Sequence, residues 1–312
     1  MTVTDVEVSG NDFVVQTEDG SLKLVDVRDK VVSFTDAAGN VIAYSYMASE
    51  EGTVDGRGIS VFEIIVGANN ASNLLMASGS GSSLYGGKGD GVNTLQGGAG
   101  GDTFTYTNGS GVITNATTGD KINFGAEYQG FAFSNDDLVL TSSEGEVLVQ
   151  SIRNQVVDVA DGKGNFACHV LMAGTDGLVD GSSLSGYAVI SGANEASNIV
   201  YASNDGSSLY GGNGGLDTLV GGDGEDCFMF GRNAGVDVIK GAFSNDIVNF
   251  TDITIDEITE VAATAGQTKF SFLSGAELIV EGNNGVGYLI QGTMYDVDLS
   301  TSSLNERRKD EN

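Results

Sequence analysis

The sequence predicts an all-β protein in which short strands stack as successive coils, arranged as an elongated tandem array. Three observations lead to this prediction. The chain repeats itself at a spacing of 125 residues, a nine-residue pattern recurs inside each repeat, and no window of a dozen residues has helical periodicity. Proline is absent from all 312 residues, which suits a backbone built from hydrogen-bonded ladders, because proline has no N–H to donate.

Matched segments make the register of the repeat visible. The segment "DFVV" at 12–15 corresponds to "DLVL" at 137–140, and "GSSLYGG" occurs at 81–87 and again at 206–212. Two kinds of segment therefore alternate along the chain. We expect a β-rich spacer over 1–66, a first glycine-rich block over 67–124, a second spacer over 125–191, a second block over 192–250, a diverged β-rich capping segment over 251–300 and a frayed tail over 301–312.

The spacers have the alternating pattern of β-hairpins. In "DFVVQTEDGSLKLVDV" (12–27) apolar and polar residues alternate on both sides of the turn signal "EDGS", and "VVSFTDAAGNVIAYSY" (31–46) repeats this around "AAGN". We therefore expect β-hairpin or β-solenoid structure in the spacers. The single histidine, His169, falls on such a strand, and we expect it to pack there rather than to act as a ligand or base.

Each glycine-rich block follows a nine-residue pattern of one turn and one short strand. The units "ANEASNIVY" (193–201) and "GGDGEDCFM" (221–229) open with turn-forming residues and close with strand-forming ones. A position near the end of each unit is always apolar, so stacked strands would align these side chains as one interior column. The column consists of Leu75, Leu84, Leu95, Phe104, Val200, Leu209, Leu219 and Phe228.

This column is too thin to stabilise the coils by itself. Each inward apolar side chain contributes about 2 kcal/mol on burial, whereas ordering the backbone costs about 1–2 kcal/mol per residue. The turns offer a further source of stability, because their glycines permit positive φ and so let carbonyl oxygens converge. The acid near the sixth position, clearest at Asp102 and Asp226, adds a carboxylate. Six or more oxygens suit Ca²⁺, whereas Mg²⁺ requires a tighter octahedron.

The units "GGAGGDTFT" (97–105) and "GGDGEDCFM" resemble the G-G-x-G-x-D-x-U-x nonapeptide of RTX, or haemolysin-type, calcium-binding proteins. The resemblance covers 68–124 and 193–250. It implies a parallel β-roll with two nonapeptides per coil and Ca²⁺ held between stacked turns on the same side. The strongest sites would pair turn 77–82 with turn 97–102 and turn 202–207 with turn 221–226, and the second block would bind more tightly.

The resemblance also implies a set of calcium ligands. Asp102 and Asp226 occupy the ligand position, and Asp217 fits when its turn is read from Gly212. The unit "GGKGDGVNTL" (86–95) departs from the pattern, because Asp90 comes early and Asn93 takes the later position. Elsewhere that position holds the neutral Asn73, Asn198, Ser82 or Ser207. The expected ligands are Gly86, Gly87, Gly89, Asp90, Asn93, Gly98, Gly100, Asp102, Gly212, Gly214, Asp217, Gly222, Gly224 and Asp226.

Charge and hydropathy narrow the partners and the location. With 14 basic and 43 acidic residues the net charge is −29, which argues against nucleic acid and anionic membranes and favours cations. No apolar run is long enough to span a membrane. The start, "MTVTDVEVSGND", lacks the features of a secretory signal peptide. The family resemblance implies type I secretion and an extracellular or cell-surface location.

We expect a non-catalytic structural or adhesive segment of a secreted bacterial protein, with Ca²⁺ driving its folding because Ca²⁺ binds only the native turns. The spacers would hold a host or cell-surface ligand. One histidine excludes an HExxH zinc site, and no GxSxG motif occurs. Two alternatives stay open. One is a calcium-dependent polysaccharide-modifying enzyme or its accessory module, since acids are plentiful; the other is a partner-binding module whose rolls are rigid rods.

Overall fold

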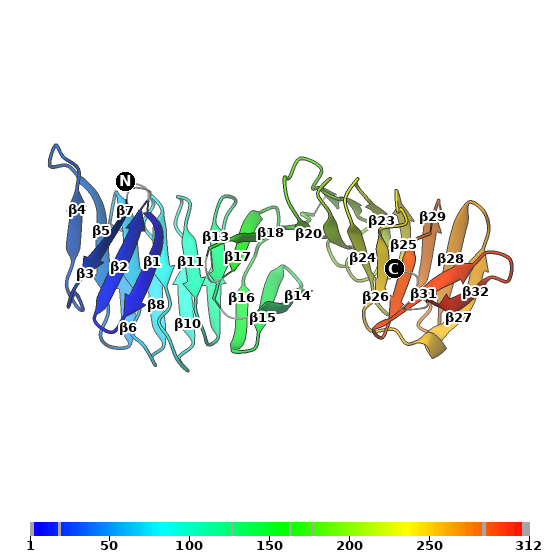
Figure 1. Cartoon of the computed structure of the whole chain (residues 1–312), viewed down its shortest axis with the longest axis horizontal. Helices are drawn as coiled ribbons and strands as arrows, with labels where there is room; N and C mark the ends of the chain where they lie inside the picture. Colours follow the sequence, from blue (N-terminus) through cyan, green and yellow to red (C-terminus); the bar gives the residue numbers. More distant parts are fainter. Residues whose placement is uncertain are drawn as a thin grey trace. The chain divides into compact units, whose positions relative to one another are not determined.

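The computed structural model describes residues 3–17, 20–125, 128–161, 164–175, 177–282 and 285–307. The chain divides into two compact units, Met1–Ala167 and Cys168–Asn312, and β-strands build both (Figure 1). Each unit contains a parallel β-roll, in which consecutive strands alternate between two facing sheets. The fold class is therefore the parallel β-roll that the sequence predicts.

In the first unit, one sheet of the roll has the order β14-β15-β16-β12-β10-β8-β6 and the other runs β17-β13-β11-β9-β7-β5-β4. The strands of the former are β6 (Gly52–Asp55), β8 (Asn73–Met76), β10 (Asn93–Gln96), β12 (Gly111–Thr114), β14 (Tyr128–Ser134), β15 (Asp137–Ser142) and β16 (Gly145–Val149). Those of the latter are β4 (Val32–Thr35), β5 (Val41–Met47), β7 (Phe62–Val66), β9 (Ser82–Tyr85), β11 (Thr103–Tyr106), β13 (Lys121–Phe124) and β17 (Val156–Asp161). A separate antiparallel sheet holds β1 (Val3–Ser9), β2 (Asp12–Thr17) and β3 (Gly20–Leu24).

The second unit repeats this design. One sheet has the order β19-β21-β23-β25-β29-β28-β27, with β19 (Leu178–Asp180), β21 (Ile199–Tyr201), β23 (Leu216–Val220), β25 (Val236–Lys240), β27 (Ile258–Ala263), β28 (Gln267–Phe272) and β29 (Glu277–Glu281). The other runs β18-β20-β22-β24-β26-β30-β31-β32, with β18 (Phe166–Met172), β20 (Ala188–Ser191), β22 (Ser207–Tyr210), β24 (Asp226–Phe230), β26 (Ile247–Phe250), β30 (Gly287–Ile290), β31 (Thr293–Asp298) and β32 (Ser303–Glu306). A single 3₁₀ turn among the described residues, η1 (Ile255–Glu257), leads into β27.

Two nonapeptides make one coil, because same-side strands lie two units apart in the sequence. Leu84 of β9 lies opposite Phe104 of β11 in parallel register, and Leu209 of β22 lies opposite Phe228 of β24. All eight residues of the expected interior column are at most 1% exposed. The predicted column is confirmed, and it forms the core of both rolls.

The spacers form the expected hairpins and also extend the coils. β2 pairs antiparallel with β3 and β4 with β5. Beyond these hairpins, β5 pairs in parallel with β7, and β7 pairs with β9. The roll of the first unit therefore begins inside the segment expected as the first spacer.

Candidate metal sites in the turns

The turns of the rolls direct one polar side chain per unit into the interior, immediately before a strand or within its first two residues. Because side chains alternate along a strand, Asp102 shares the inward face of β11 with Phe104, and Asp226 shares that of β24 with Phe228. Asp102 and Asp226 are only 1% and 2% exposed. Acidic side chains are thus placed where apolar ones normally lie.

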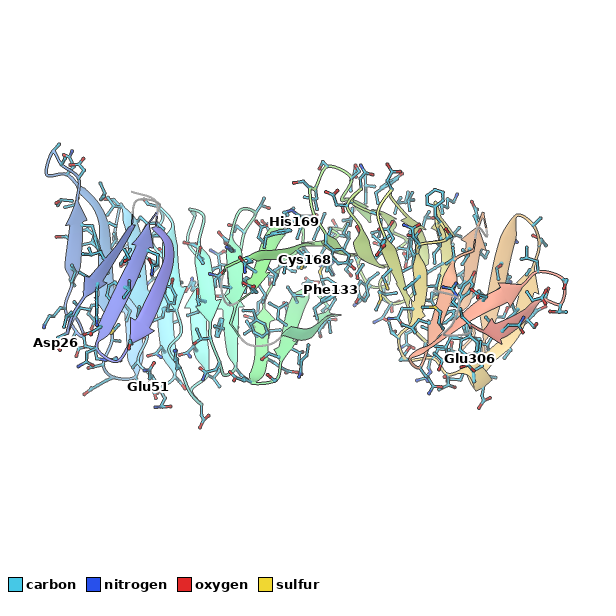
Figure 2. The ribbon with its side chains drawn as sticks, in the orientation of Figure 1. Asp26, Glu51, Phe133, Cys168, His169 and Glu306 are labelled. Carbon is cyan, nitrogen blue, oxygen red and sulfur yellow. The ribbon has the colours of Figure 1, made fainter. Side chains whose placement is uncertain are left out.

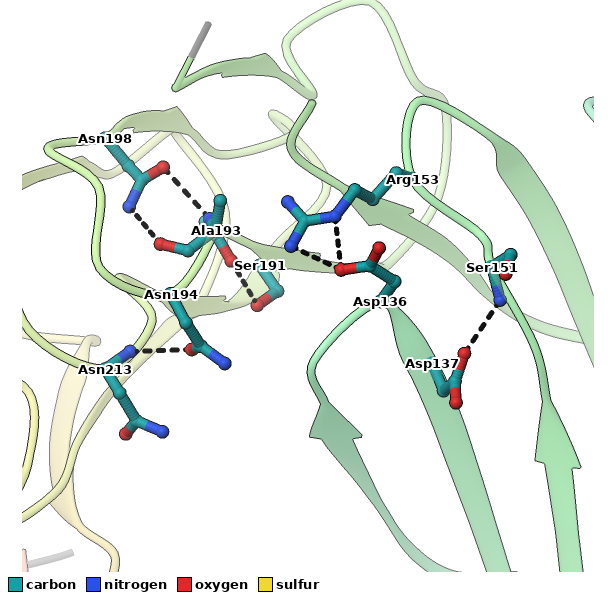
Figure 3. Close-up of polar contacts among 10 residues, drawn as sticks. Asp136, Asp137, Ser151, Arg153, Ser191, Ala193, Asn194, Asn198 and Asn213 are labelled. Carbon is teal, nitrogen blue, oxygen red and sulfur yellow. Dashed lines mark hydrogen bonds and ion pairs between the residues drawn. The ribbon is translucent and has the colours of Figure 1, made fainter. Parts of the chain in front are cut away.

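Each of these carboxylates caps its own turn. Asp102 Oδ2 accepts a hydrogen bond from the Gly98 N–H at 2.7 Å, and Asp226 Oδ2 accepts one from the Gly222 N–H at 2.7 Å. The neutral residues act in the same way: Asn198 Oδ1 accepts from the Ala193 N–H while Asn198 Nδ2 donates to the Ala193 carbonyl, both at 2.9 Å (Figure 3). One side-chain oxygen is therefore committed to the backbone of the turn.

The second oxygen of each strong candidate is different. Asp102 Oδ1, Asp226 Oδ1 and Asp217 Oδ2 are buried, and no hydrogen bond of normal geometry reaches them, although the Ser82 and Ser207 N–H groups lie close enough to lower the pKa of Asp102 and Asp226. Burial raises the pKa of each of these carboxyls from 3.8 to about 6. At neutral pH the folded chain would therefore hold buried, ionised and incompletely satisfied oxygens, which is costly unless a cation or proton lies beside them.

A second carboxylate lies one coil further along from Asp102 and from Asp226, and it is not among the ligands expected from the sequence. Asp120 Oδ1 accepts the Asp102 N–H at 2.8 Å, and Asp246 Oδ1 accepts the Asp226 N–H at 2.9 Å. The charge of Asp246 contributes to the raised pKa of Asp226. Asp120 and Asp246 lack the G-G-x-G preceding them, but both keep the signal D-x-U, in "DKI" and "DIV", by which they could have been found.

Two buried acids lie opposite each other on the other side of the second roll. Asp217 of β23 lies opposite Asp237 of β25, which is fully buried. The Asp217 N–H lies close enough to lower the pKa of Asp237, but no hydrogen bond of normal geometry reaches either carboxylate oxygen of Asp237. Burial, followed by the charge of Asp217, raises the pKa of Asp237 to about 8. The backbone N–H and amide of Asn198 donate to Asp217 Oδ1 at 2.7 and 2.8 Å. This pair needs a shared proton or a bound cation, and Asp237, in "DVI", was also missed.

Of the two remaining polar candidates, Asn93 points into the roll and Asp90 lies on its surface. Asn93 is buried, and its Oδ1 accepts the Asn73 N–H at 3.1 Å, so it has the position of Asp217 in the first roll. Asp90 is exposed at the turn surface. The expected same-side pairing of turns is present, since Ser207 lies opposite Asp226 and Ser83 opposite Thr103.

We expected the glycines to be needed for positive φ, and this is wrong for the turns 97–102 and 221–226. Gly87, Gly89, Gly212 and Gly214 do have positive φ, of 96°, 107°, 105° and 70°. In contrast, the first-position Gly86 and all of Gly98, Gly100, Gly222 and Gly224 lie outside the left-handed region.

These last four are required by the stacking of turns. A Cβ on Gly98 would lie 1.9 Å from the Ser78 carbonyl oxygen, and one on Gly222 would lie 2.5 Å from that of Ser203. A Cβ on Gly100 or Gly224 would meet the backbone of the adjacent turn at 2.2 Å. The sequence alone does not show whether a glycine is needed for a positive φ or for the close approach of a neighbouring turn.

Among the described residues no group of three or more His, Cys, Asp or Glu side chains is placed to hold a metal. A cation in these turns would therefore need backbone carbonyl oxygens beside the carboxylates. His169, on β18, lies with Nε2 3.0 Å from the Ser185 carbonyl oxygen (Figure 2). Within the described part of the chain, no helix is long and apolar enough to cross a membrane.

No protein-family model and no curated protein matches the sequence. One of the solved structures that align with this chain is the crystal structure of the extracellular lipase LipA from Serratia marcescens. The identity is 16% and the TM-score 0.34, and the alignment covers 74% of this chain and 40% of that one. The aligned region is thus less than half of the lipase chain, and a similarity at this level carries no information on activity.

Proposed function

We propose that this chain is a calcium-binding, non-catalytic structural or adhesive segment of a secreted RTX-type protein, whose rolls become stable when Ca²⁺ binds. One observation supports this proposal above the others. Asp102, Asp217 and Asp226 each keep one buried carboxylate oxygen without a hydrogen-bond partner at a turn, and none of the ion pairs between described residues includes them.

The residues present fit a calcium ion. The unpartnered oxygens of Asp102, Asp217 and Asp226 are hard, anionic donors, which Ca²⁺ prefers. Neighbouring turns bring backbone close to these acids, so carbonyl oxygens of the glycine-rich turns would complete the ligand set. When bound, the ion would neutralise the buried charge. The protein supplies the rest: the Gly98 and Gly222 N–H groups fix the orientation of Asp102 and Asp226.

The alternative of a polysaccharide-modifying enzyme has no comparable support. The acids with raised pKa in the turns are at most 2% exposed, so a polymeric substrate would not reach them. The choice between a structural or adhesive role and a partner-binding role depends on the spacers, and a pull-down that compares chains with and without their rolls would test it.

A calcium titration followed by far-ultraviolet circular dichroism tests the proposal. We expect a cooperative gain of β signal with Ca²⁺ and little change with Mg²⁺. Asp226→Ala should raise the calcium midpoint more than Asp223→Ala, because Asp226 is buried at the turn and Asp223 is exposed. Equal effects of the two substitutions would contradict the assignment of the ligands, and an unchanged spectrum on addition of Ca²⁺ would contradict the function.

A further inference from the structure

A four-strand module occurs three times in the described chain, and in two of its copies it receives the end of a roll. Its strands are β1-β2-β3-β4 in the first copy, β14-β15-β16-β17 in the second and β27-β28-β29-β30 in the third (Figure 1). The first two copies are related by the 125-residue repeat, so β3 corresponds to β16 and β4 to β17. We call this unit the docking module.

In the second and third copies the last two strands of the docking module each pair with a strand of a roll. β16 pairs in parallel with β12, and β17 with β13. In the second unit β29 pairs in parallel with β25, and β30 with β26. Each module therefore receives two strands at once, one from each sheet of the last coil of a roll.

The first copy has no such neighbour among the described residues. β3 pairs only with β2, and β4 pairs only with β5, so both are edge strands. They carry on their outer sides the positions that pair with a coil in the other two copies. Exposed sheet edges are sites at which further strands add.

The exposure of apolar side chains follows the same division. Val147 of β16 is fully buried, whereas the corresponding Leu22 of β3 is 47% exposed. Next to these edges Val25 and Val31 are 66% and 69% exposed. Three exposed apolar side chains thus lie at or beside the open edge, and for one of them, Leu22, the second copy buries the corresponding residue.

The hydrogen bonds at the occupied edges identify the groups that would engage. The Asp158 N–H of β17 donates to the Asp120 carbonyl at 3.0 Å, and the Gln150 N–H donates to the Ile113 carbonyl at 2.9 Å. In the third copy the Gly287 N–H donates to the Asp246 carbonyl at 3.2 Å. By the repeat, Ser33 corresponds to Asp158 and Val25 to Gln150.

We propose that the open edge formed by β3 and β4 is a docking site for the last coil of a further β-roll block, joined ahead of residue 3. The coil would add one parallel strand to β3 and one to β4. The Ser33 N–H would donate to the carbonyl of that coil's turn aspartate, as Asp158 does to Asp120. An isolated peptide strand would fill only one of the two edges, whereas a roll coil presents two strands at the required spacing.

A fusion chain tests this proposal. Residues 67–127 are placed directly before Val3 in the full chain, so that the new junction copies the one between Glu127 and Tyr128. Backbone amide exchange is then measured in saturating CaCl₂ for the fused and the parent chains. We expect exchange of the Val25 and Ser33 amides to slow by at least about tenfold in the fused chain.

Unchanged exchange in the fused chain would overturn the proposal. Protection of the same amides in the parent chain that increases with protein concentration would also overturn it, because the occupant would then be a second copy of this chain.

A matched pair of proline substitutions in the parent chain gives a second, independent test. Proline is tolerated in a strand only where its missing N–H faces an open edge. Ser33→Pro should therefore leave the melting temperature nearly unchanged. Asp158→Pro, at the equivalent and occupied position, should lower it by about 5 °C or more. Similar losses from the two substitutions would overturn the assignment of β4 as an open edge, and so the proposal.

Discussion

Replacing Asp226 with asparagine should change the stability of the chain in opposite directions with and without calcium. The amide keeps an oxygen that can accept the Gly222 N–H, as Asn198 does in its own turn. It removes the negative charge from a side chain that is 2% exposed. The perturbation therefore isolates the charge from the hydrogen bond.

The magnitude follows from the pKa. Burial raises the pKa of Asp226 from 3.8 to about 6, and each unit corresponds to about 1.4 kcal/mol, so keeping the carboxylate ionised in the folded state costs about 3 kcal/mol at pH 7.5. In chelator, Asp226→Asn should raise the free energy of unfolding by up to this amount. In calcium at one thousand times its dissociation constant, the variant loses a contribution of about 4.1 kcal/mol per site, which exceeds this gain, so the variant becomes the less stable chain by about 1 kcal/mol.

Urea unfolding at pH 7.5, in chelator and in CaCl₂, measures both effects. Asp223→Asn is the control, because Asp223 is exposed at a neighbouring position of the same turn and should alter neither value by more than about 0.5 kcal/mol. A loss of stability for Asp226→Asn in chelator, or the same change in both buffers, would refute the reasoning.

Three further predictions concern pH, turn stacking and a buried glutamate. In chelator, the free energy of unfolding should fall as the pH rises from about 4 to about 6. The pKa of Asp102 is raised to about 6 in the folded chain, which therefore binds this proton more tightly than the unfolded chain does. Urea titrations that show a rise over this pH range would contradict the prediction. Gly98→Ala should cost about 2 kcal/mol or more, because its Cβ would lie 1.9 Å from the Ser78 carbonyl oxygen, whereas Gly79→Ala, with nothing within 4 Å, should be close to neutral in the same thermal melts. Burial, followed by the charge of Asp55, raises the pKa of Glu63 from 4.5 to about 7, so Glu63→Gln should stabilise the chain at pH 8 and much less at pH 5, and an equal effect at both pH values would count against it.

The regular part of the fold could be predicted from the sequence because it depends on local periodicity. A nine-residue spacing places Leu84 and Phe104 on the same face of same-side strands, and both are fully buried. The partners of the spacer strands could not be predicted in this way. β5 pairs in parallel with β7, one coil further along the chain, and β16 pairs with β12 although β13, β14 and β15 lie between them in the sequence. Alternation alone does not distinguish either pairing from a hairpin.

The site was predicted in part for a related reason. Asp102 and Asp226 have the complete glycine signature before them, and both are buried at turns as expected. Three more acids lie in the same rows of stacked turns but follow turns without the glycine signature: Asp120, Asp237 and Asp246. In the sequence only the D-x-U ending indicates them. The role of glycines such as Gly98 depends on the distance to the backbone of the next coil, which is a property of stacking and not of the single turn.

The buried carboxylate oxygens of the turns should bind a divalent cation. Anomalous diffraction from crystals grown with CaCl₂ tests this binding most directly. We expect calcium peaks within about 2.3–2.6 Å of Asp102 Oδ1 and Asp226 Oδ1. Peaks confined to exposed acids such as Asp90 and Asp223, with none beside Asp102 or Asp226, would contradict this expectation.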